Sequence, residues 1–167
     1  MTKKINEFID YDKEYEGIIR IGATTKSFDT ESDEENILEN FEVTEEQLDN
    51  VRKSFLGESD QLPPMYSAVK HKGKPLYKMA RKGREIERAT RKIIVTEFDI
   101  KRISPTELFF RISSSKGTYI RSIANDFGEK LGVGGYLKKL RRTRIGEFRI
   151  GEFGEKVRDI GFTIFDF

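Results

Sequence analysis

The sequence predicts a single α+β domain in which a layer of strands packs against helices. Three segments, 13–22, 92–102 and 107–113, place apolar side chains at alternate positions, which is typical of half-buried strands. Two others, 44–57 and 119–132, repeat apolar residues every three or four positions, which is typical of amphipathic helices. Strands interspersed with helices, without an internal repeat, favour an α+β layer structure.

The first strand and the first helix carry clear local signals. KEYEGIIRIG at 13–22 places on one face Tyr15, Gly17, Ile19 and Ile21. The polar stretch 23–36 has no apolar period, so we expect a loop there. In the following helix Thr44 and Gln47 fit a capping box, and Gly57 is a plausible stop.

The segment 61–92 is basic and irregular. Its paired prolines and two glycines divide it into a loop, a short helix at about 76–82 and an extended piece. We expect an excursion that binds a partner, with its tyrosines either stacking on that partner or holding the excursion to the body. The strands 92–102 and 107–113 then form a hairpin, joined by a turn that contains proline.

Helical spacing returns at Tyr119 and ends at Gly132. Arg121 lies in the first turn and points away from the apolar stripe of this helix. YLKKLRR at 136–142 is predicted to be another short helix, because its two leucines are three positions apart.

Charge is strongly segregated although the net charge is only +2. Between Asp29 and Asp60 there are 12 acidic and 2 basic residues, whereas 61–102 holds 12 basic and 4 acidic ones and 116–149 holds 9 and 3. Basic blocks favour a polyanionic partner such as RNA, because they release condensed counterions on meeting phosphates. The alternative is that these blocks are simply solvated helix faces.

Composition and motifs exclude several classes of function. No cysteine and a single histidine, His71, leave no disulfide and make a transition-metal site improbable. There is no apolar run long enough for a membrane helix, no secretory signal, and no phosphate loop, nucleophile elbow or dinucleotide-binding fingerprint. A reducing compartment such as the cytoplasm is allowed by the lack of cysteine, although it is not required.

Three residues could form a pocket at the edge of the sheet. Tyr15 begins a strand, Asp29 ends the stretch TTKSFD, and Arg121 begins a helix. An aromatic face suits an extruded base, and a guanidinium can organise a nearby carboxylate. The sequence leaves open whether the three meet.

Three stretches resemble consecutive motifs of the bacterial tRNA pseudouridine-55 synthases. They are KEYEGIIRIGATTKSFD, LPPMYSAVKHKGKPLYKMARKGREIERATR and SSSKGTYIRSIANDFGEKLGVGGYLKKLRRTRIGEF. The resemblance extends from about Lys13 to about Phe148 and implies a mixed, largely antiparallel sheet flanked by helices over 1–167. It also implies an RNA isomerase without a cofactor, which acts on a flipped uridine in the T-loop of tRNA.

The resemblance assigns roles to individual residues. Tyr15 matches the tyrosine that packs on the flipped base, Asp29 an acidic residue near the pocket, Arg121 the arginine that pairs with the catalytic aspartate, and Leu140 an apolar residue lining the site. The excursion 61–92 matches a loop that grips the tRNA hairpin. The candidate RNA-binding residues are Lys70, His71, Lys72, Lys74, Arg81, Lys82, Arg84, Lys116, Arg141 and Arg142.

One departure from the family pattern concerns the nucleophile. The family's catalytic aspartate lies in a motif G-x-x-D-P-x-A-T-G upstream of this strand, and no Asp-Pro pair occurs in the 167 residues. We therefore expect a partial catalytic domain, without the nucleophile or the C-terminal RNA-binding domain, that is inactive alone. The alternative is an inactive module that binds structured RNA. An exposed sheet edge should also favour self-association.

Overall fold

The computed structural model describes residues 12–65 and 89–146, together with the backbone of short strands at 70–71, 74–75, 148–149 and 165–166. The predicted short helix at about 76–82 lies outside these residues. So do Lys72, Arg81, Lys82 and Arg84, and the side chains of Lys70, His71 and Lys74.

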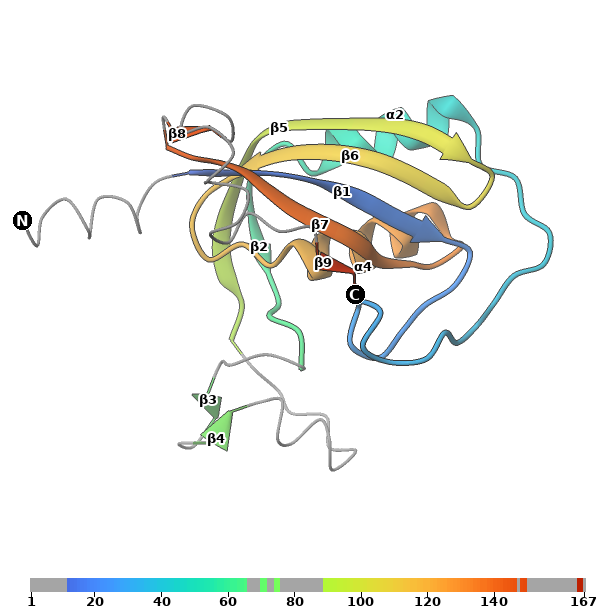
Figure 1. Ribbon diagram of the computed structural model, residues 1–167, viewed down its shortest axis with the longest axis horizontal. Coiled ribbons are helices and arrows are strands. Elements are labelled where there is room, and N and C mark those ends of the chain that lie inside the picture. The colour runs from blue at the N-terminus through green and yellow to red at the C-terminus, as the bar shows by residue number, and fades with distance from the viewer. Residues whose placement is uncertain are drawn as a thin grey trace, which may run out of the picture.

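A seven-stranded sheet forms the centre of the fold (Figure 1). Its strands are β1 (Lys13–Ile21), β2 (Gly57–Gln61), β5 (Arg91–Ser104), β6 (Glu107–Ser114), β7 (Gly135–Ile145), β8 (Phe148–Arg149) and β9 (Phe165–Asp166). The order is β2-β5-β6-β1-β7-β8, with β9 also paired to β7, and each of these pairs is antiparallel. A separate pair joins β3 (Lys70–His71) to β4 (Lys74–Pro75).

Two helices, α2 (Glu45–Ser54) and α4 (Ile120–Leu131), lie on one side of the sheet (Figure 1). Phe55 at the end of α2 stacks on Phe127 of α4 at 5.9 Å between ring centroids, and both meet Phe98 of β5 at 5.8 Å. Such aromatic contacts add to the free energy of apolar burial. The predicted α+β class is confirmed, and one core joins the helices to the sheet.

The predicted capping box of α2 and the predicted end of α4 are confirmed. The backbone N–H of Gln47 donates to Thr44 Oγ1 at 3.1 Å, and the backbone N–H of Thr44 donates to Gln47 Oε1 at 2.8 Å, so the capping box is complete. Gly132 ends α4 with φ of 82°, a left-handed conformation that glycine adopts without steric cost. Gly57 does not cap α2, because Phe55 is the cap and Gly57 begins β2.

The predicted helix at 136–142 is wrong, since these residues belong to β7. Their apolar residues do not alternate, because both faces of the strand are covered where it begins: Leu137 is buried in the core, and Tyr136 is buried near Glu34 and Arg20. The basic part of the strand finds a partner beyond β1, since Lys138 Nζ donates to Glu107 Oε2 of β6 at 2.9 Å. Long-range pairing with β1 thus overrides the leucine spacing.

No helix in the part of the chain that the structure describes is long and apolar enough to cross a membrane.

Candidate functional site

The loop that follows β1 buries the carboxylate of Asp29, whose side chain is only 1% exposed. Phe28 has φ of 68°, a left-handed conformation that costs a non-glycine residue about 1–2 kcal/mol. The Phe28 carbonyl accepts a hydrogen bond from the Leu137 N–H at 2.8 Å, and the Thr25 hydroxyl donates to the Asp29 carbonyl at 2.6 Å. The loop is therefore tied to β7 and to itself.

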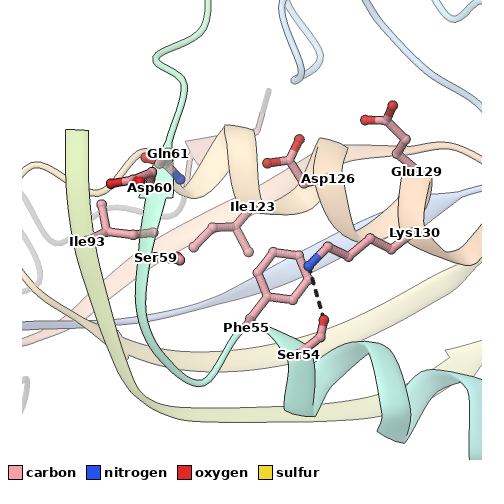
Figure 2. A pocket seen from close by; sticks show the side chains of 10 residues that line it. All are labelled: Ser54, Phe55, Ser59, Asp60, Gln61, Ile93, Ile123, Asp126, Glu129 and Lys130. Atoms are coloured by element: carbon pink, nitrogen blue, oxygen red, sulfur yellow. Dashed lines mark hydrogen bonds between the residues drawn. The ribbon is translucent and has the colours of Figure 1, made fainter. Parts of the chain in front are cut away.

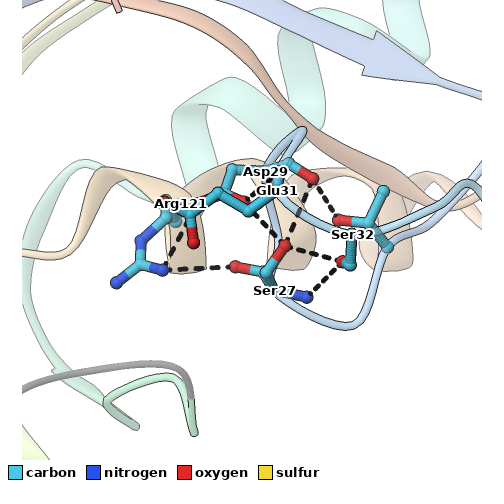
Figure 3. Close-up of polar contacts among 6 residues, drawn as sticks. Ser27, Asp29, Glu31, Ser32 and Arg121 are labelled. Atoms are coloured by element: carbon cyan, nitrogen blue, oxygen red, sulfur yellow. Dashed lines mark hydrogen bonds and ion pairs between the residues drawn. The ribbon is translucent and has the colours of Figure 1, made fainter. Parts of the chain in front are cut away.

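Asp29 forms an ion pair with Arg121 (Figure 3). Its Oδ2 lies 3.3 Å from Arg121 Nη1, and its Oδ1 accepts hydrogen bonds from the Ser27 hydroxyl at 2.6 Å and the Glu31 N–H at 2.9 Å. Asp29 is therefore a carboxylate partner of Arg121 within this chain, whereas the family motifs led us to expect that partner only in a segment outside it. Buried charges persist when they are paired and hydrogen-bonded in this way.

The start of α4 positions Arg121. Gln61, at the end of β2, accepts a hydrogen bond from the Tyr119 N–H at 2.8 Å and donates one to the Tyr119 carbonyl at 3.0 Å. Tyr119, the N-cap of α4, makes no side-chain cap, and the first turn holds no acidic residue. The positive end of the helix dipole and the guanidinium thus favour an anion at this place.

The Tyr119 ring lies outside the apolar core, between two guanidinium groups. The Cζ atoms of Arg91 and Arg121 lie 5.4 and 6.0 Å from its centroid. Arg91 also donates to the Gly117 carbonyl at 3.3 Å, which holds the turn before α4.

A group of cations gathers beside Tyr15. Burial lowers the pKa of Lys13, and the nearby charges of Arg142 and Lys116 lower it further. Burial raises the pKa of Tyr15, an effect that Arg142, hydrogen-bonded to its hydroxyl, partly offsets. Cations that repel one another in a partly buried position are relieved by an anion such as a phosphate.

The other predicted site residues lie on β7. Leu140 faces Gly17 across the strand pair and Arg141 faces Glu16, and both line a shallow hollow of about 160 Å³. Among the described residues, no hydrogen bond or ion pair joins Tyr15 or Leu140 to Asp29 or Arg121. The structure thus brings Asp29 and Arg121 together and leaves Tyr15 with Arg142.

A cavity of about 450 Å³ opens between β2, the end of α2 and α4 (Figure 2). Its floor is apolar, whereas Asp60, Asp126 and Glu129 lie along its rim, and burial raises the pKa of Asp126. Lys130 contributes a cation, but its Nζ lies over the Phe55 ring at 4.2 Å (Figure 2). These carboxylates would repel phosphate, so this cavity is not a candidate RNA surface.

In the described ranges, no three His, Asp or Glu side chains cluster closely enough to hold a metal ion.

Four residues of this region were not named from the sequence, and of these only Ser27 carries a local signal. Ser27 stands two positions before Asp29, a spacing at which a hydroxyl commonly bonds a neighbouring acceptor, so it was predictable. Gln61 was not, because its partner lies 58 positions away. Lys13 and Arg91 could not be singled out from the sequence, because the chain contains many other lysines and arginines.

Comparison with known proteins identifies two family models. The model described as TruB family pseudouridylate synthase (N terminal domain) matches residues 1–120, and the model of the tRNA pseudouridylate synthase B C-terminal domain matches residues 121–160. The chain is 48% identical over 160 residues to the tRNA pseudouridine synthase B of Chloroherpeton thalassium and 46% identical over 149 residues to that of Flavobacterium johnsoniae. These alignments cover 95% and 89% of the chain, and 66% and 65% of the two relatives.

Among solved structures, a chain of a Cbf5-Nop10-Gar1 complex is similar, with a TM-score of 0.64 and 28% identity. That likeness covers 90% of this chain and 35% of the other. Because one family model matches residues 1–120, well over half of the 167 residues, the chain belongs to the TruB family of pseudouridylate synthases.

Proposed function

We propose that this chain forms the pocket and RNA surface of a synthase that converts uridine in the T-loop of tRNA, at position 55, to pseudouridine. The observation that carries the proposal is the buried Asp29–Arg121 ion pair at the start of α4, in a chain of this family. The names of the two relatives support tRNA as the substrate.

The reaction breaks the bond between N1 and C1′ of the nucleotide and joins C5 to C1′, so the hydrogen on C5 is lost to water. Asp29 anchors the Arg121 guanidinium, which in turn holds the catalytic carboxylate beside the sugar. Tyr15 packs on the flipped base, and Leu140 lines the site. No step uses a cofactor.

The RNA surface includes the cations around Tyr15. Lys116 and Arg142 bind backbone phosphates, and Lys13 lies close enough to both for their charges to lower its pKa further than burial does. Arg141 extends this surface along β7, and the basic residues of 61–92 grip the stem. Each phosphate that is neutralised releases counterions, so affinity should fall steeply with salt.

Tritium release tests this function. A T-loop stem-loop carrying uridine with tritium at C5 loses the label to water when pseudouridine forms. We expect no release by the chain alone, because the G-x-x-D-P motif is absent from its sequence. We expect release once the chain is extended at its N-terminus by a segment with that motif, and turnover by the chain alone would contradict this assignment of roles.

The second candidate is a module that binds structured RNA without chemistry, which the cations beside Tyr15 also favour. Affinity for the stem-loop, measured against salt, tests the RNA surface, and Lys116→Ala should lower the slope of log affinity against log salt by about 1. Binding without release by the extended chain would favour the module. We place either activity in the cytoplasm, where tRNA is modified.

A further inference from the structure

The loop that holds Asp29 also contains two serines, Ser27 and Ser32, to which the proposed chemistry gives no role. Ser27 is fully buried, at 0% exposure. Ser32 lies five positions further along and is partly buried. Figure 3 shows the Ser27 hydroxyl bonded to the Asp29 carboxylate and the Ser32 hydroxyl bonded in turn to Ser27.

The hydrogen bonds in this loop have only one consistent direction. An ionised carboxylate accepts and does not donate, so the Ser27 hydroxyl donates to Asp29 Oδ1 at 2.6 Å. A hydroxyl has one hydrogen, so the 2.7 Å contact between the two serine oxygens is donated by Ser32. Ser32 Oγ in turn accepts from the Ser27 N–H at 2.9 Å. The result is a chain that runs from this N–H through both hydroxyls to the carboxylate.

Ser27 touches both members of the ion pair. Its hydroxyl bonds the carboxylate, and its carbonyl accepts a hydrogen bond from Arg121 Nη1 at 3.4 Å, the nitrogen that also meets Asp29 Oδ2. The other terminal nitrogen of the guanidinium points away from the loop (Figure 3). Aligned hydrogen bonds polarise one another, so the chain holds the carboxylate more firmly than isolated bonds would.

We propose that Ser27 and Ser32 are positioning residues for Arg121. Their hydroxyls fix the Asp29 carboxylate so that Oδ2 faces Nη1, and this sets which edge of the guanidinium is left for the catalytic carboxylate. The role in the reaction rests on the proposed function, whereas the effect on the guanidinium is a property of the folded chain.

The first arm of the test measures the guanidinium directly. Nitrogen NMR on the full chain reports how fast Arg121 exchanges its two terminal nitrogens by rotation about the bond between Cζ and Nε. With Nη1 held, exchange is slow, and Ser27→Ala should make it about tenfold faster through the loss of one hydrogen bond to the charged carboxylate. Ser32→Ala should raise it less, and Ser27→Thr, which keeps the hydroxyl, should restore slow exchange.

The second arm measures tritium release by the extended chain. Ser27→Ala should lower kcat about tenfold with KM unchanged, because a misplaced group costs transition-state stabilisation rather than substrate binding. Ser59→Ala, at an exposed serine of β2, is the matched control and should change neither quantity.

The outcomes separate the two claims. If the terminal nitrogens of Arg121 exchange at the parent rate in both Ser27→Ala and Ser32→Ala, the positioning role is overturned. It is also overturned if they exchange fast in a Ser27→Thr variant whose fold is intact. Faster exchange with unchanged kcat would show that the guanidinium is loosened without consequence and would overturn the role in the reaction. Absence of release by the unmutated extended chain would contradict the proposed function, and the NMR signal alone would then decide the positioning of Arg121.

Discussion

The ion pair between Asp29 and Arg121 predicts a large loss of stability when either member is replaced. The Asp29 side chain is 1% exposed and that of Arg121 is 19% exposed. In Asp29→Asn the amide oxygen can keep the bonds from the Ser27 hydroxyl and the Glu31 N–H, but the NH₂ group then meets Arg121 donor to donor. Breaking a buried pair costs about 3–5 kcal/mol, and partial exposure of the arginine places this pair near the lower end.

Urea unfolding measures this cost. With a slope of about 1–3 kcal/mol per M, a loss of about 3 kcal/mol lowers the midpoint by about 1–3 M. Arg121→Met should cost a similar amount, and the double variant should cost about 2 kcal/mol less than the sum of the two single ones, because one buried charge no longer lacks a partner.

An exposed ion pair provides the control for this experiment. Arg111 and Asp99 are also 3.3 Å apart, but their side chains are 46% and 63% exposed. Arg111→Met should therefore cost at most about 1 kcal/mol. Single costs below about 0.5 kcal/mol at Asp29 and Arg121 that add in the double variant would refute the reasoning.

Three further predictions concern pH, packing and assembly. Burial raises the pKa of Asp126 above 3.8, so its contribution to stability is present below that pH and is lost as pH rises through the folded pKa. The free energy of unfolding of Asp126→Asn, measured in urea, should therefore rise relative to that of the parent between about pH 4 and pH 7. Hydrogen bonds from Arg52 and Lys53 lower the pKa of Asp49, so Asp49→Asn should show the opposite trend, and matching trends would contradict the reasoning. Gly128→Ala should lower the free energy of unfolding more than Gly132→Ala does, because the new Cβ at Gly128 would lie 2.1 Å from the Gly135 nitrogen. At Gly132 only the positive φ opposes alanine, at about 1 kcal/mol. Equal losses in the two variants would argue against this packing. The outer edge of β2 has no paired strand among the described residues, so light scattering should detect self-association at raised concentration, and a strictly monomeric species would count against it.

Local signals in the sequence predicted the helices α2 and α4 and the three strands β1, β5 and β6. The capping box of α2, the left-handed glycine that ends α4 and the alternation in β1, β5 and β6 each depend on residues a few positions apart. Such signals are present in the chain before it folds, so they can be recognised without knowledge of tertiary contacts.

Elements stabilised by distant partners were missed. β2 has the polar sequence GESDQ and forms because it pairs with β5, whereas β7 forms because it pairs with β1. Neither the β2 segment nor the β7 segment shows a periodic pattern of apolar residues, because each becomes a strand through its pairing with a distant strand.

The candidate site divides in the same way. The residues of the ion pair were named from the sequence, but their contact joins positions 92 apart and required the fold. The same holds for the direction of the serine hydrogen bonds, which follows only from the distances between Ser27, Ser32 and Asp29. Lys13 lies near Arg142 because β1 pairs with β7. Since the sequence predicted a helix at 136–142, this proximity could not be predicted from it.

Tritium release by the extended chain, compared with its Arg121→Met variant, tests the central claim most directly. We predict that the extended chain releases label from a T-loop stem-loop and that the variant loses at least about 100-fold in kcat, because its catalytic carboxylate is no longer held in place. The variant should still bind the stem-loop through the remaining cations. Equal release by both proteins would contradict the account.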